Sequence, residues 1–213
     1  GGALAGLGGW MIVEPMSPGL ADMMAWARWQ ILYALSVGGC IGAAIGAING
    51  WNQGSRLHMF RGLAFGLLIG AVGGVMGMQF GGAVMQLVLG PGGSLETAPK
   101  ILAIFARSLA FIPFGASIGM VVGAAGQSWK RAFVGALGGA VGGLIAGMSF
   151  DLIASALGSL TIAMKGGAES TDAQGIPRVV AEIGAPARAA TAALLGGSIG
   201  LFTAIFIQLT RSA

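Results

Sequence analysis

Three ionisable side chains are candidates for chemistry in or beside the apolar segments of this sequence: His58, Arg107 and Asp151. His58 is the only histidine; it lies in a basic turn, whereas a haem or pigment ligand would sit on an apolar helix face, so we expect a solvated side chain. Asp151 follows nineteen uncharged residues and could relay protons or coordinate an ion, although its place favours the membrane interface. Arg107 could line an anion path, but its long apolar stem favours a charge reaching the interface.

No other pattern in the sequence indicates catalysis or metal binding. There is no Ser-His-Asp set, no HExxH motif and no P-loop, and one histidine and one cysteine, Cys40, cannot form a metal cluster with scattered acids. Gln79, Gln86 and Gln208 could form hydrogen bonds between helices. The sequence therefore predicts a protein that is not an enzyme and has no cofactor, with bound lipid expected.

Glycines at every fourth position are the dominant pattern. In the stretch 131–150 this spacing places the glycines on one face of a helix, which would destabilise a helix in water but lets a second backbone approach closely in lipid. The pattern predicts glycine-zipper packing between helices. The glycines expected to form these faces are Gly38, Gly42, Gly46, Gly62, Gly66, Gly70, Gly74, Gly115, Gly119, Gly123, Gly135, Gly139, Gly143, Gly147, Gly196 and Gly200.

The composition is that of an integral membrane protein. Of the 213 residues, 55% are hydrophobic and only 8% are charged, whereas a soluble domain has roughly 25% charged residues. The net charge of +4 is typical of basic interfacial loops and anionic lipid contacts, so no nucleic-acid partner is expected.

The hydrophobic segments predict an all-α membrane protein with about six transmembrane helices. Residues 1–13 are too short to span and are expected to be the end of a span. Short interfacial helices are expected before the later spans. The expected spans are 31–50, one of about 20 to 25 residues between Gly62 and a stop at Gly90-Pro91-Gly92-Gly93, 114–126, 132–150 and 191–209. The expected interfacial helices are 20–30, 99–112 and 179–190.

Two stretches of the chain resemble each other, which predicts an internal repeat. The run at 70–74 matches the run at 139–143, and Ser-Ile-Gly at 117–119 matches Ser-Ile-Gly at 198–200. The alternative is chance similarity among Gly/Ala-rich helices. We predict one polytopic domain, 1–213, of three two-helix units with pseudo-threefold symmetry: about 28–90, 99–160, and 178–213 completed by 1–15.

The segment 115–153 resembles a glycine-rich membrane module of uncharacterised bacterial proteins, some of which carry a forkhead-associated domain. No soluble segment here is long enough for that domain. The resemblance implies a bacterial inner (cytoplasmic) membrane. The positive-inside rule then places the basic turns 50–61 and 127–131 and the C-terminus in the cytoplasm. The glycine rows are also similar to those of the Tim translocase family, whose polar signature residues cannot be placed here.

These patterns favour a non-catalytic structural or accessory subunit, packed through its glycine rows within a larger membrane protein complex. The expected partners are membrane lipid and other membrane subunits or further copies of the chain. The alternative is a small channel or transporter, with a path along the pseudo-threefold axis or between repeats. A third hypothesis is an enzyme of lipid metabolism or a pigment-binding protein.

Overall fold

The computed structural model describes residues 1–18, 23–52, 54–90, 99–125, 128–164 and 178–211. All regular structure within these ranges is helical, and they contain no strand. The elements are α1 (Gly2–Val13), η1 (Glu14–Met16, a 3-10 turn), α2 (Met23–Trp51), α3 (Arg56–Leu89), α4 (Lys100–Gly119), α5 (Val121–Ala125), α6 (Trp129–Met164) and α7 (Arg178–Arg211).

Five of these helices are long and apolar enough to cross a membrane, which indicates a membrane-embedded protein. They are α2, α3, α4 with the start of α5, α6 and α7. The sequence predicts about six spans, but α1 has only 12 residues, or about 18 Å of helix, and is not one of the five.

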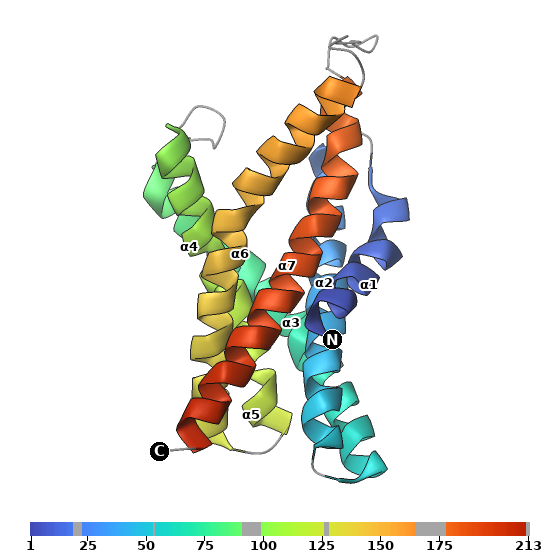
Figure 1. The fold of residues 1–213 in the computed structure, drawn as a ribbon, viewed down its shortest axis with the longest axis vertical. Helices are drawn as coiled ribbons and strands as arrows, with labels where there is room; N and C mark the ends of the chain where they lie inside the picture. Colours follow the sequence, from blue (N-terminus) through green and yellow to red (C-terminus); the bar gives the residue numbers. More distant parts are fainter. Residues whose placement is uncertain (19–22, 53, 91–98, 126–127, 165–177, 212–213) are drawn as a thin grey trace.

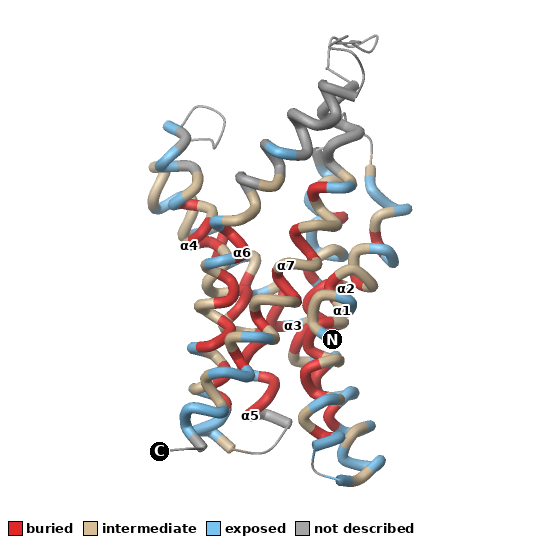
Figure 2. Tube along the Cα trace, in the orientation of Figure 1, coloured by how far each residue is buried: buried red, intermediate tan, exposed pale blue. Residues whose placement is uncertain are grey.

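The helices form a closed bundle in which each packs beside its neighbours (Figure 1). The order of contact is α1, α2, α3, α4, α6 and α7, and α7 packs against α1 to close the ring. The buried residues gather in the middle of the bundle, while the ends are exposed (Figure 2). The central cluster is aliphatic and comes mainly from α2, α4, α5 and α7, with Val37, Ile118 and Ile199 fully buried.

The expectation of separate interfacial helices is wrong for the described residues. α2 runs without a break from Met23, and α4 and α7 continue through Pro113 and Pro186. A proline removes one backbone donor, but membrane helices tolerate it because donors from neighbouring groups or local backbone adjustments can satisfy the freed carbonyl. α6 likewise continues to Met164, beyond the expected end of its span at Phe150.

The connection between α2 and α3 is shorter than the polar loop expected from the sequence. α2 ends at Trp51 and α3 begins at Arg56, so His58 lies in the first turn of α3. Gly54 has φ +77°, a backbone conformation that glycine adopts readily and other residues rarely adopt, and this allows the tight reversal. Gly90, with φ +80°, ends α3 where the sequence predicts a stop.

Glycine meets backbone at three antiparallel helix pairs. A Cβ atom added to Gly42 of α2 would lie 2.8 Å from the Cα of Gly70 in α3. A Cβ on Gly119 would lie 3.0 Å from the Cα of Gly139 in α6, and one on Gly196 of α7 would lie 2.7 Å from the carbonyl carbon of Gly2 in α1. Of the glycines named from the sequence, only Gly200 would have room for an ordinary Cβ contact. These backbones are too close for any side chain.

A second column of glycines lies on α1, α3 and α6, and the four-residue spacing alone does not separate it from the first column. On each of these helices it faces the other neighbouring helix. Gly9 of α1 abuts the Val37 Cα of α2, and Gly142 of α6 abuts the Ile199 Cα of α7, where an added Cβ would lie 2.6 Å away in both cases. Gly73 of α3 contacts Ser117 of α4. In α3 and α6, adjacent glycines such as Gly73 and Gly74 or Gly142 and Gly143 therefore serve two interfaces at once.

Gly70→Ala is expected to destabilise the bundle, by about 1–3 kcal/mol as for other overpacked interiors, because the new methyl would collide with the backbone of α2. The matched control is Gly82→Ala in the same helix, where a Cβ would meet nothing within 4 Å. This control should be neutral or mildly stabilising, since Ala favours helix by about 1 kcal/mol over Gly. Thermal unfolding in mild detergent measures both, and equal midpoints would contradict the packing described here.

Candidate functional site

The most concentrated polar cluster among the described residues joins α1 to α7. The Glu14 carboxylate, at the start of η1, forms an ion pair with the Arg188 guanidinium of α7. Arg188 Nε donates to Glu14 Oε2 at 3.1 Å and Arg188 Nη2 donates to Oε1, so the pair is bidentate. The side chains are only 23% and 15% exposed for Arg188 and Glu14, so water screens the pair weakly.

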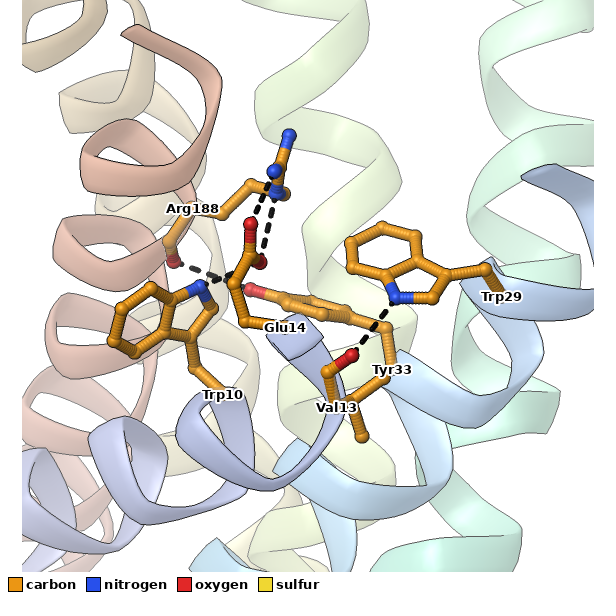
Figure 3. Close-up of polar contacts among 6 residues, drawn as sticks. All are labelled: Trp10, Val13, Glu14, Trp29, Tyr33 and Arg188. Atoms are coloured by element: carbon orange, nitrogen blue, oxygen red, sulfur yellow. Dashed lines mark hydrogen bonds and ion pairs between the residues drawn. The ribbon is translucent and has the colours of Figure 1, made fainter. Parts of the chain in front are cut away.

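Aromatic side chains surround the ion pair (Figure 3). Trp10 Nε1 donates a third hydrogen bond to Glu14 Oε2 at 2.7 Å. The Arg188 guanidinium carbon lies 5.2 Å from the ring centroid of Trp29 and 5.8 Å from that of Trp26, within the range of cation–π attraction. The carboxylate is therefore neutralised and saturated with donors, and the cation is sheltered by two indoles.

The same cluster also includes hydrogen bonds from side chains of α2. Trp29 Nε1 donates to the Val13 carbonyl at the end of α1 at 3.1 Å, and the Tyr33 hydroxyl donates to the Arg188 carbonyl at 3.3 Å. Three helices, α1, α2 and α7, thus meet through side chain to backbone bonds as well as through the ion pair. A helix as short as α1 is marginal by itself, so these contacts help to hold it in place.

The chemistry available to this cluster is electrostatic. Each Glu14 oxygen accepts at least one hydrogen bond from a fixed donor, which leaves a poor general base. No nucleophile with an adjacent base lies in the cluster. Within the described ranges, no group of three or more His, Cys, Asp or Glu side chains is placed to hold a metal ion. The arrangement is suited to fixing helices relative to one another.

The candidates named from the sequence do not meet at this site. Arg107 lies in α4 with its guanidinium carbon 4.4 Å from the ring centroid of Phe150 in α6, so it contacts a neighbouring helix. His58 is exposed in the first turn of α3. Asp151 directly follows the candidate span of α6, and its side chain lies outside the described part of the chain.

Sequence analysis missed the cluster because its members are far apart in the chain. Glu14 looks like part of a helix stop with Pro15, and Trp29 like an interfacial anchor. One signal was available: Arg107 and Arg188 each stand twelve residues before a matching glycine. A basic residue at a repeated position in a membrane helix calls for a partner, but only the structure identifies Glu14.

Comparisons with protein-family models, with curated proteins and with solved structures found no match to this chain.

Glu14→Gln is expected to lower the stability of the protein by about 2 kcal/mol, because it leaves the Arg188 charge half-buried without its counter-charge. Removing one partner of a fully buried ion pair costs about 3–5 kcal/mol of stability, and the partial exposure of this pair reduces the expected loss. Adding Arg188→Gln should restore part of the loss, since no charge then stays unpaired. Arg56→Gln, on an exposed side chain, is the control and should change stability by less than about 0.5 kcal/mol. Additive losses in the double variant would argue against a coupled pair.

Proposed function

We propose that this chain is a non-catalytic structural subunit of a membrane protein complex. The observation that carries the proposal is how its partly buried polar side chains are used: several of those described join helix to helix within the chain. The Glu14 cluster is the largest case. Three serines, Ser36, Ser117 and Ser198, each donate a hydrogen bond to a glycine carbonyl of a neighbouring helix, at 2.8, 2.7 and 2.8 Å.

These serine bonds also support three two-helix units with pseudo-threefold symmetry. The donors are separated by 81 residues each, and the acceptors are Gly9, Gly73 and Gly142, on α1, α3 and α6. We infer that the units are α2–α3, α4–α6 and α7–α1, the third being split between the two ends of the sequence. Residues aligned by the serines, Val37, Ile118 and Ile199, are all fully buried.

That triplet bears on transport along the proposed axis. An open aqueous path needs polar lining, whereas this position carries three aliphatic side chains at 0% exposure. The next triplet, Ile41, Val122 and Thr203, is also buried and contains one hydroxyl. A packed axis supports a rigid structural element more than an axial channel.

One observation favours the alternative of a small channel or transporter with a path between units. A cavity of about 470 Å³ lies between α2 and α7, and Asn49, Asn52 and Thr203 are among its lining residues. Thr203 Oγ1 is buried and has no hydrogen-bond partner within the described part of the chain. Such a hydroxyl calls for water or a polar solute, so a path here stays the second candidate.

The partner contacts of a structural subunit would not use the glycine faces, which meet backbone inside the chain. Large exposed side chains offer another surface, such as the row on α3 formed by Phe65, Leu68, Val72, Met76 and Phe80. These residues follow helical spacing and form one apolar face. We therefore propose that neighbouring subunits, or lipid, cover this outer face.

Purification of the tagged chain from its own membranes tests the structural proposal. In mild detergent we expect a second membrane protein to co-migrate in fixed ratio, and Val72→Arg with Met76→Arg on the outer face of α3 should release it. A lone monomer, stable and unaccompanied, would overturn the proposal.

A flux measurement tests the transport alternative. Liposomes that contain the protein and are loaded with ions or small solutes should show no flux above liposomes without protein. Flux that is lost on Thr203→Val would favour the transport alternative.

A further inference from the structure

A cleft lined by an exposed cation lies beside the Glu14 cluster. Its volume is about 440 Å³, and it lies between the segment that follows α1 and the first turns of α2. Its apolar wall includes Met16, Met24, Trp29 and Leu32, and its one charged side chain is Arg28. The cleft therefore combines a positive charge with a surface that favours hydrocarbon.

Arg28 differs from its neighbour Arg188 in how its charge is compensated. Arg188 has the Glu14 carboxylate and two indole rings. Arg28 is exposed, and no described carboxylate lies within ion-pair distance of it. Glu14, the described acid beside the cleft, is thus already engaged with Arg188, and among the described residues Arg28 keeps an exposed charge.

The place of Arg28 along α2 indicates which kind of molecule the cleft suits. α2 is a candidate span and begins at Met23, so Arg28 lies in the second turn from the start of this helix, where a long basic side chain can reach the headgroup region. Leu32 follows four residues later on the same helix face and is 45% exposed. A positive charge near the end of a membrane helix, followed by an exposed aliphatic side chain on the same face, complements a phospholipid, whose negative phosphate lies at the end of its acyl chains.

We propose that this cleft binds one anionic phospholipid. The lipid phosphate accepts hydrogen bonds from the Arg28 guanidinium, whose fork of donors suits phosphate oxygens. An acyl chain lies along Leu32, with Met16 and Met24 as flexible apolar contacts. A free anion would use the guanidinium alone and would gain nothing from the apolar wall. This site does not depend on the proposed structural role.

Native mass spectrometry of the detergent-solubilised protein, with phosphatidylglycerol or phosphatidylcholine added to the micelles, tests the site. We expect one phosphatidylglycerol to be retained in preference to phosphatidylcholine. Arg28→Gln should lower its retention about fivefold, the equivalent of about 1 kcal/mol for one basic residue at a membrane surface. Arg56→Gln, exposed in the first turn of α3, is the matched control and should leave retention unchanged.

Two further measurements distinguish a lipid site from a site for any small phosphate. Leu32→Asn keeps the charge and should weaken phosphatidylglycerol retention, and soluble glycerol phosphate should fail to compete at equal concentration. Unchanged unfolding midpoints establish that the variants are folded. Equal retention of phosphatidylglycerol by Arg28→Gln and the parent protein, or full competition by glycerol phosphate, would overturn the proposal.

Discussion

The close approach of helix backbones is the constraint on which the rest of this structure depends. Lipid tails are as apolar as leucine, so helices in a membrane gain little by hiding side chains and must gain by contact between their backbones and small residues. At Gly42 and Gly119 the facing backbone lies where a Cβ would be. The 41 glycines of the chain are therefore explained mainly by contact and not by flexibility, although each lowers the intrinsic helix propensity.

This closeness determines where the other side chains can be placed. A helix that shows glycine to both neighbours must turn its bulk outward, and α3 accordingly exposes leucine and phenylalanine along its length. The close approach also brings the carbonyl oxygens of one helix within reach of the short serine side chains of the next. Ser117 is an example, because its Oγ lies 2.7 Å from the Gly73 carbonyl oxygen. Longer polar side chains such as Asn or Gln would need more space than these interfaces leave.

Local patterns in the sequence predict much of the fold. Composition and apolar runs identify an all-helical membrane protein, and the four-residue glycine spacing identifies faces that meet backbone. The second glycine column was missed because Gly142 and Gly143 look like one broad patch, whereas adjacent residues on a helix point 100° apart and face different neighbours. The continuity of α4 and α7 was missed because a proline lacks a backbone donor and therefore predicts the end or a kink of a helix. The groups that compensate for the missing hydrogen bond come from the tertiary structure, which the local sequence does not show.

The Glu14 cluster cannot be predicted from the sequence for a related reason: it lies where α1 departs from the glycine pattern of α3 and α6. If the units are aligned by their serine bonds, Trp10 stands where α3 and α6 have Gly74 and Gly143, and Glu14 stands where they have Met78 and Gly147. α1 therefore loses its close glycine contact with α7 after Gly6, and the segment is joined to its neighbours by the Glu14–Arg188 ion pair and the Trp29 indole donor instead. The directional bonds between Glu14 and Arg188 fix the position of α1 along α7. A glycine face without such bonds would resist the sliding of one helix along the other less. α1, the shortest of the six helices that form the ring, thus has its position defined by directional contacts where its glycine contact with α7 ends.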